Sequence, residues 1–178
     1  MSHAKRLSRK KMYSAYCFDV FKDQVRWPNG LKLDRDLIVH GGISVMIPVL
    51  DQDHIILIRQ YRYGAKDYLW EIPAGTIHKR EKPLACAKRE IQEEIGYQAK
   101  TWKNILNFYA SPGFNTEIIH SFVASDLKKT KTALEADEIL EAKTFSLKQA
   151  ARLIRTKKIR DAKSLIPLFY YLLEKKAL

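Results

Sequence analysis

The sequence predicts an α/β fold in which a mixed β-sheet lies between helical layers. Short runs rich in β-branched and aromatic residues indicate strands, and they recur along most of the chain. One helical segment interrupts these strands, and two more follow with apolar residues at helical spacing. Strands with interspersed helices are typical of layered folds. The chain has 178 residues, of which 46% are hydrophobic, so a single domain of this length can bury a substantial core.

The first part of the chain is expected to be extended. Residues 1–14 are rich in lysine and arginine and are predicted to be a basic, flexible tail. Residues 15–178 are predicted to be one domain, in which residues 15–42 form N-terminal strands. The sequence Trp-Pro-Asn-Gly at positions 27–30 predicts a turn between two of these strands.

The middle of the chain is expected to alternate between strands and one helix. Two apolar runs, 43–50 and 55–59, flank a polar turn and predict a β-hairpin. Another extended segment follows at 68–73. The next segment is predicted to be a helix from Pro83 to Gly96, because proline suits a first helical turn and glycine suits a left-handed C-cap.

The last third of the chain is expected to end in helices. Strands are predicted at 101–109, 118–125 and 140–145, with a charged loop at 128–136. Apolar residues at helical spacing then predict helices at 146–157 and 162–175.

The charge of the chain narrows the classes of partner. The net charge is +12, which attracts nucleic acid, membrane surfaces or phosphorylated small molecules. We interpret the basic clusters as solvated faces, since no aromatic-interleaved RNA-binding motif accompanies them. No apolar stretch is long enough to cross a bilayer, and no secretory signal is expected. Two cysteines without metal-ligand spacing predict reduced thiols in a cytoplasmic protein.

Three glutamates gather on the predicted central helix. Glu90 and Glu94 are four residues apart and therefore lie within about 40° of each other, with Glu93 one step round the helix. These carboxylates repel one another, and an ion pair from Arg89 to Glu93 relieves only part of the repulsion. A hard divalent cation such as Mg²⁺ would relieve the rest. The alternative is a solvent-facing acidic helix with one salt bridge.

The residues before this helix favour the metal interpretation. From Gly75 to Tyr97 the sequence matches G-x5-E-x7-R-E-U-x-E-E-x-G-U at every specified position, where U is apolar or aromatic. This pattern resembles the Nudix box, the signature of Nudix hydrolases. The resemblance implies a Nudix-type α/β/α sandwich with a mixed β-sheet and an N-terminal antiparallel β-subdomain, in which the box forms a loop, a helix and a second loop.

The resemblance also implies roles for individual residues. Glu90 and Glu94 would be the principal Mg²⁺ ligands, and Mn²⁺ could substitute for Mg²⁺. Glu93 would be a further ligand in the catalytic group, and Arg89 would orient the carboxylates. The backbone carbonyl of Ala74 would be an additional metal ligand.

Flanking segments resemble the Nudix enzymes that act on ADP-ribose and other nucleoside diphosphate sugars. The segments are 58–62, 69–75 and 111–114. From them Arg59 and Arg62 are expected to contact the pyrophosphate or the distal sugar, because the guanidinium group gives paired donors to phosphate. Glu71 would bind sugar hydroxyls or assist the metal site, and Pro112 would shape a loop beside the substrate. A surface charge for Arg59 and an edge-strand carboxylate for Glu71 remain the alternatives.

The general base is expected outside the acidic helix. Glu138 is the candidate, since a water beside Mg²⁺ needs a proton acceptor and a carboxylate loop could close onto it. Glu135, Asp137 and Glu141 compete for this role, and a solvated acidic loop is the alternative.

Together these features predict a Mg²⁺-dependent hydrolase that splits nucleoside diphosphate sugars into nucleoside monophosphate and sugar phosphate, with ADP-ribose first and GDP-mannose or similar sugars next. An RNA 5′-end pyrophosphohydrolase and a non-catalytic nucleotide- or RNA-binding module are the alternatives. The resemblance also implies a homodimer formed through residues 15–42. No membrane partner is expected, and nucleic acid is not favoured.

Overall fold

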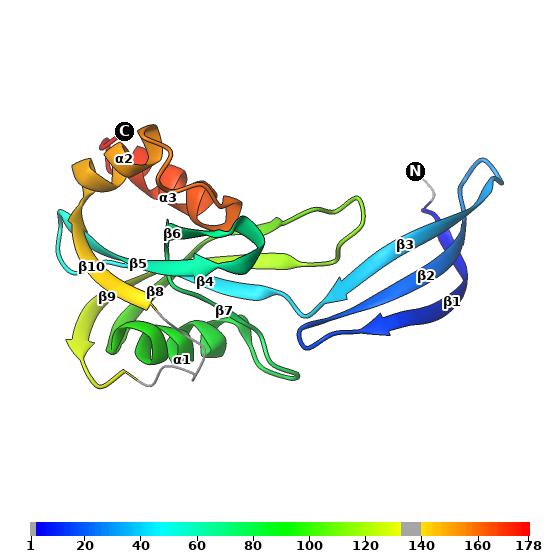
Figure 1. Ribbon diagram of the computed structural model, residues 1–178, viewed down its shortest axis with the longest axis horizontal. Coiled ribbons are helices and arrows are strands. Elements are labelled where there is room, and N and C mark those ends of the chain that lie inside the picture. The colour runs from blue at the N-terminus through cyan, green and yellow to red at the C-terminus, as the bar shows by residue number, and fades with distance from the viewer. Residues whose placement is uncertain (1–2, 133–139) are drawn as a thin grey trace. The chain divides into compact units, whose positions relative to one another are not determined.

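The computed structural model describes residues 3–132 and 140–178 of the chain. The chain divides into two compact units (Figure 1). The first comprises Met1–Gly42 and Tyr109–Ile118, and the second comprises Ile43–Phe108 and Ile119–Leu178. The acidic helix predicted from the sequence belongs to the second unit.

The first unit is a three-stranded antiparallel sheet in the order β1-β2-β3. Its strands are β1 (Lys5–Ser14), β2 (Phe18–Arg26) and β3 (Lys32–His40). The predicted turn at 27–30 is confirmed, because the N–H of Trp27 donates to the carbonyl of Leu31 at 2.8 Å. Gly30 adopts a φ of 86° there, a left-handed conformation that glycine accepts without steric cost.

The prediction of a flexible tail is wrong for residues 5–14, which form strand β1 along the whole length of β2. Side-chain pairs between the two strands account for this. Arg9 donates through Nε and Nη2 to the two carboxylate oxygens of Asp23 at 2.7 and 2.6 Å. Lys11 donates to Asp19 at 2.8 Å. The basic residues of this segment therefore find acidic partners in the next strand, which composition alone does not reveal.

The second unit contains two sheets. The strands are β4 (Ile43–Pro48), β5 (His54–Arg62), β6 (Asp67–Glu71), β7 (Ala74–Thr76), β8 (Tyr97–Tyr109), β9 (Ile118–Lys129) and β10 (Leu140–Ser146), of which β8 and β9 reach into the first unit at one end. A short 3₁₀ turn, η1 (Tyr63–Ala65), joins β5 to β6. One sheet has the order β7-β4-β9-β8, with β4 parallel to β9, and the other is antiparallel with the order β10-β5-β6. The combination is a mixed arrangement, as predicted.

The predicted hairpin of residues 43–59 is wrong as a pairing. The chain does turn between β4 and β5, and Val49 bridges Ile55. Beyond that bridge β4 pairs with β7 and β9, whereas β5 pairs with β6 and β10. Strand β4 and the first half of β5 are buried on both faces and therefore fit into sheets that helices cover on each side.

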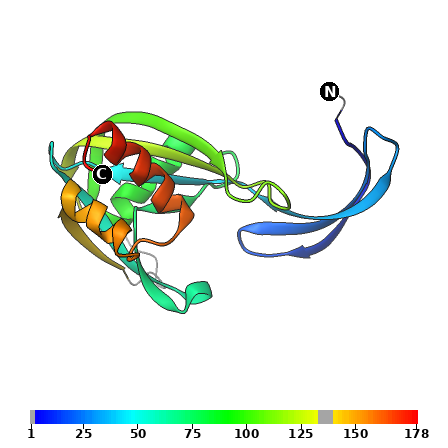
Figure 2. The same ribbon diagram turned by 90° about the horizontal axis from the view of Figure 1, so that it is seen from above.

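Helices cover both sides of these sheets. Figures 1 and 2 show α2 (Leu147–Arg155) and α3 (Ala162–Glu174) on one side and α1 (Pro83–Ile95) on the other. Alternate residues of strand β5 pack against the helices on opposite sides of the sheet. Ile55 and Leu57 pack in the cluster that contains α2 and α3, whereas Ile56 and Ile58 pack in the cluster that contains α1. The predicted α/β/α sandwich is thus confirmed. The prediction of a charged loop at 128–136 is wrong for Lys128 and Lys129, which belong to β9, and residues 133–136 of it lie outside the described residues.

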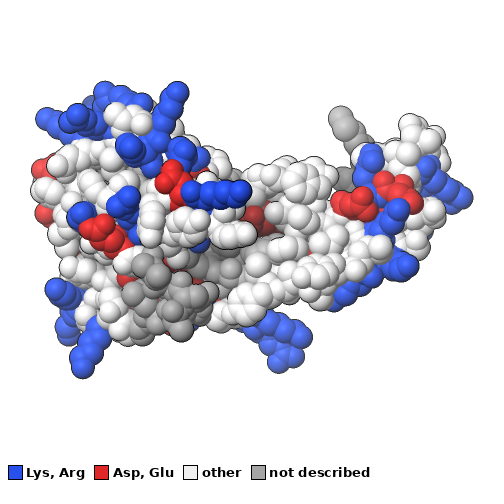
Figure 3. All heavy atoms as spheres, viewed as in Figure 1, with Lys and Arg blue, Asp and Glu red and all other residues white. Residues whose placement is uncertain are grey.

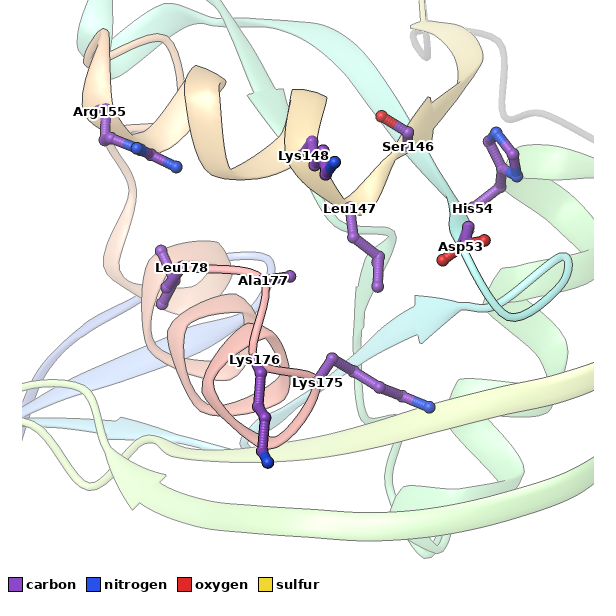
Figure 4. A pocket seen from close by; sticks show the side chains of 10 residues that line it. All are labelled: Asp53, His54, Ser146, Leu147, Lys148, Arg155, Lys175, Lys176, Ala177 and Leu178. Atoms are coloured by element: carbon purple, nitrogen blue, oxygen red, sulfur yellow. The ribbon is translucent and has the colours of Figure 1, made fainter.

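The described helices include none that is both long and apolar enough to cross a membrane. A cavity of about 720 Å³ lies between the start of α2 and the end of the chain (Figure 4). Its lining residues include none of the predicted site residues that the structure describes.

Candidate active site

The acidic helix α1 begins and ends where the sequence predicts. Pro83 occupies the first turn, and Gly96 caps the end with a φ of 68°. Its inner face buries Ala87 and Ile91 completely. The same packing brings two carboxylates into a mostly buried position, because Glu90 is 8% exposed and Glu94 is 2% exposed. Buried carboxylates are costly unless they are paired or bound to a cation.

Arg89 links the carboxylates of this helix. Its Nη1 donates to Glu90 at 2.6 Å and to Glu93 at 2.9 Å. Its Nε and Nη2 donate to Glu81 at 3.1 and 3.2 Å, and Nη2 also donates to the carbonyl of Thr76 at 3.3 Å. These contacts hold the pKa of Glu81 below its ordinary value. The guanidinium therefore fixes three acidic side chains and the loop before the helix.

Strand β7 approaches the helix closely at two residues. The N–H of Ala74 donates to Oε2 of Glu94 at 3.1 Å. At Gly75 a β-carbon would lie only 1.7 Å from Oε1 of Glu90, so the carboxylate occupies the space that any larger residue would need. The glycine of the motif is therefore required for a close approach of side chain to backbone.

The donor set fits a hard dication. Arg89 pairs with the carboxylates of Glu81, Glu90 and Glu93, so several acidic side chains converge on this end of the loop and helix. Carboxylate oxygens are the ligands that Mg²⁺ prefers. As the side chains stand, the described residues contain no group of three or more His, Cys, Asp or Glu that is arranged to hold a metal ion. Arg89 engages Glu90 and Glu93, so a metal ion would compete with it for them.

A second buried charge group lies at the end of β6. Glu71 is 1% exposed and accepts hydrogen bonds from Arg62, through Nε at 3.0 and 3.1 Å and through Nη2 at 2.6 Å. Lys163 on α3 donates to the same oxygen, Oε2, at 2.6 Å. Burial alone would raise the pKa of Glu71, but the two cations outweigh it and hold this pKa below its ordinary value. Glu71 is thus ionised and buried, not a simple edge-strand carboxylate.

The two groups are electrostatically connected. Burial disfavours the charged form of Arg62, but the hydrogen bonds to Glu71 and the charges of Glu71 and Glu94 raise its pKa overall. The guanidinium of Arg62 is therefore close enough to Glu94 on the acidic helix to be stabilised by its negative charge. Its side chain is 36% exposed, so a solute can approach it.

The remaining predicted residues are placed differently. Arg59 is exposed in the second half of β5, with its guanidinium 5.0 Å from the ring centre of Tyr68. Pro112 belongs to the first unit, in the segment Tyr109–Ile118. Glu138 lies outside the described residues, as do its competitors Glu135 and Asp137. Glu141 is exposed on β10 and pairs with Lys143 at 2.6 Å.

Sequence reasoning missed three residues at the start of α3. Lys163 contacts Glu71, Asp161 contacts Lys163 at 3.0 Å, and Ser164 accepts from the N–H of Ile72 at 3.0 Å. Asp161 could have been recognised as a helix N-cap, since its side chain accepts from the N–H of Ser164. The partners of Lys163 and Ser164 lie 92 residues away in the chain, and no local pattern predicts such pairing.

The thiol of Cys86 lies beside Arg89 and the backbone of Gly75 in the candidate site. It is buried, and burial together with the charge of Glu90 raises its pKa to about 12. A thiol with such a pKa is not ionised at neutral pH and is a poor nucleophile.

The second unit thus combines sheets between helical layers with an acidic helix whose carboxylates Arg89 binds. A family model described as NUDIX domain matches residues 41–169. The chain belongs to the Nudix family and is a Nudix hydrolase. The matched range covers the second unit as far as residue 169 together with the segment Tyr109–Ile118, and it includes the whole acidic helix.

Relatives match along nearly the full chain. The ADP-ribose pyrophosphatase of Bacillus subtilis is 34% identical over 93% of this chain and 91% of its own length. The methanol dehydrogenase activator of Bacillus methanolicus is 33% identical over 96% of this chain and 93% of its own. A crystal structure of an ADP compounds hydrolase shares the fold, with a TM-score of 0.85 at 21% identity over 100% of this chain and 98% of that one.

Proposed function

We propose that this Nudix hydrolase cleaves the pyrophosphate bond of nucleoside diphosphate sugars in a Mg²⁺-dependent reaction and releases a nucleoside monophosphate and a sugar phosphate. ADP-ribose is the first expected substrate, followed by GDP-mannose and other sugars of this class. The observation that supports this proposal is the group of carboxylates on the acidic helix. Arg89 donates to Glu90 and Glu93, and the N–H of Ala74 donates to Glu94. The similarity to the ADP-ribose pyrophosphatase of Bacillus subtilis supports the choice of substrate.

The acidic helix would hold the metal. Glu90, Glu93, Glu94 and the carbonyl of Ala74 are the proposed ligands, with Mn²⁺ as a substitute for Mg²⁺. When bound, the dication would neutralise diphosphate charge and lower the pKa of a bound water. Arg89 would orient the carboxylates of Glu90 and Glu93 and would give up part of its contacts with them when the cation binds. Glu93 is exposed to 33% at its side chain, which suits a ligand that also faces the reacting water.

Arginine side chains would bind the diphosphate. Arg62 uses Nε and Nη2 to bind Glu71. The other N–H groups of its guanidinium would donate to phosphate oxygens. Arg59 would contact the distal phosphate or sugar from its exposed position. Glu71 would act through Arg62, and Pro112 would shape the loop near the substrate. Glu138 remains the proposed proton acceptor.

A substrate panel tests this function. Purified protein with Mg²⁺ is incubated with ADP-ribose, GDP-mannose, UDP-glucose, NADH and triphosphorylated RNA, and the products are identified by chromatography and mass spectrometry. We expect ADP-ribose to yield AMP and ribose 5-phosphate, and chelation of the metal to stop the reaction. The proposal fails if no nucleoside diphosphate sugar is split while the chain is folded and metal is present.

The second candidate is hydrolysis at the 5′ end of RNA, which the net charge of +12 favours. On the face of the second unit seen in Figure 3, however, Lys and Arg gather in separate groups, one of them over α2 and α3, and not in one continuous track. Turnover of the RNA substrate alone in the panel would favour this candidate.

We also propose that the chain is a homodimer joined through its N-terminal sheet. Every residue of β1 is exposed, and apolar side chains among them, Met12 and Tyr13, are 53% and 62% exposed. Apolar groups exposed together on a sheet are typical of a protein interface.

Sedimentation velocity checks the assembly. We expect a species of about twice the 20.7 kDa of one chain, and we expect Tyr13→Asp to weaken dimerisation by about 30-fold if Tyr13 is an anchor worth ~2 kcal/mol. Tyr63→Asp is the matched control, because Tyr63 is 84% exposed in the second unit and should leave the dimer intact. A wild-type chain that stays monomeric at high concentration would contradict the proposal.

A further inference from the structure

Five consecutive residues connect the buried charge group to the acidic helix, and each is held by a partner. Glu71 is bound by Arg62 and Lys163, the N–H of Ile72 donates to Ser164, and the carbonyl of Pro73 accepts from Met46 at 3.0 Å. Ala74 then donates to Glu94, and Gly75 lies against Glu90. Each residue of the segment 71–75, which extends from the start of helix α3 to the carboxylates of α1, is thus fixed by at least one contact.

Two of these five attachments come from the first turn of α3. Asp161 fixes that turn, because its side chain accepts from the N–H of Ser164 and also pairs with Lys163. The side chains of Lys163 and Asp161 are only 18% and 17% exposed, so both are largely removed from water. Removal of one partner from a buried ion pair leaves the other charge without compensation, so such a pair resists separation.

Lys163 and Arg62 meet at a single atom. Both donate to Oε2 of Glu71 at 2.6 Å, so the position of one cation limits the position of the other. Glu71 is completely buried and cannot turn to follow a moving arginine. If Lys163 were neutral and apolar, the carboxylate would lose one of its two anchors, and the guanidinium of Arg62 would be free to shift with it.

We propose that Lys163 is a positioning residue, which acts through Glu71 to fix the guanidinium of Arg62 for the diphosphate of the substrate. This role rests on the function proposed above. Lys163 does not touch the substrate in this arrangement, and Ser164 supports it by holding the backbone of the segment 71–75. The start of α3 therefore belongs to the substrate-binding machinery, although it is far from the acidic motif in the chain.

The test compares Lys163→Met with wild type in steady-state hydrolysis of ADP-ribose. We expect KM to rise about tenfold while kcat changes by less than about threefold, because binding and not the metal chemistry is disturbed. The Mg²⁺ concentration for half-maximal rate should stay unchanged. Lys163→Arg should restore most of the affinity, and Lys148→Met, an exposed lysine on α2, should behave as wild type.

Combining the change with Arg62→Met separates positioning from general stability. In the Arg62→Met background we expect Lys163→Met to add less than about a twofold rise in KM, since the residue on which it acts is gone. An equal rise in both backgrounds would show a structural role only and would overturn the proposal. If Lys163→Met does not fold, as judged by circular dichroism, Lys163→Gln replaces it and must also raise KM.

The outcomes also separate this role from the proposed function. If wild type splits ADP-ribose and the folded Lys163 variants keep its KM, only the role of Lys163 is wrong. If folded wild type splits no nucleoside diphosphate sugar, the proposed function is wrong, and the role of Lys163 falls with it.

Discussion

We expect Glu94→Gln to lower kcat for ADP-ribose by about 10²–10³-fold, which corresponds to ~3–4 kcal/mol of transition-state stabilisation. Glu94 is 2% exposed and sits on the N–H of Ala74, so it is held where a metal ligand would be needed. The amide of glutamine has nearly the same shape and its oxygen can still accept from Ala74. The negative charge, however, is lost, and the variant should also need more Mg²⁺ for half-maximal rate.

Steady-state kinetics across a Mg²⁺ series measures this change, with thermal unfolding as the check on the fold. Glu174→Gln is the matched control, because Glu174 is an exposed glutamate that pairs only weakly with Lys103 at 3.4 Å. It should keep wild-type rates. If Glu94→Gln also kept them, the assignment of Glu94 as a metal ligand would be wrong.

The second large effect is expected for Gly75→Ala. The added β-carbon would lie 1.7 Å from Oε1 and 1.8 Å from Cδ of Glu90, so the glutamate must leave its position. That position is also the one in which it accepts from Arg89 at 2.6 Å. We expect kcat to fall by about 10²-fold through the displaced ligand and the free energy of unfolding to fall by ~1–3 kcal/mol through overpacking.

Gly64→Ala provides the control, since a β-carbon at Gly64 would meet no atom within 4 Å. It should leave kcat unchanged and alter the free energy of unfolding by less than about 0.5 kcal/mol. Denaturant unfolding measures the free energy of unfolding, and steady-state kinetics on the same preparations measures kcat. Wild-type activity in Gly75→Ala would mean that Glu90 can work from another position, and that the close approach is not needed for function.

The layers of the fold could be predicted from the sequence, but the pairing of its strands could not. The apolar runs that become β4 and β5 are visible as strands, and the short polar turn between them suggests a hairpin. The two runs nevertheless enter different sheets. Both are buried on both faces, so alternation gives no hint of their neighbours, and long-range partners such as β9 and β10 decide the pairing.

The same limit holds for the site. The ion pair of Arg89 with Glu93 follows from helical spacing and is confirmed at 2.9 Å. The contacts of Glu71 with Arg62 and Lys163 join three separate elements, and only the folded chain reveals them. Residues whose partners lie within one turn of helix can be predicted from sequence, whereas a buried ionised group depends on what the tertiary structure brings to it.

The hydrogen bond from the N–H of Ile72 to Ser164 makes part of the candidate site depend on a helix that is synthesised after it. A ribosome completes the acidic helix by residue 95, whereas the segment that presents Ala74 and Gly75 to it is held by β4 and, through Ile72, by α3, which begins at Ala162. Domains fold as they emerge from the N-terminal side during synthesis. A nascent chain stopped before α3 would thus carry every residue of the motif and still lack the hydrogen bond of Ser164 and the ion pair of Lys163, which help to position the segment beside the acidic helix.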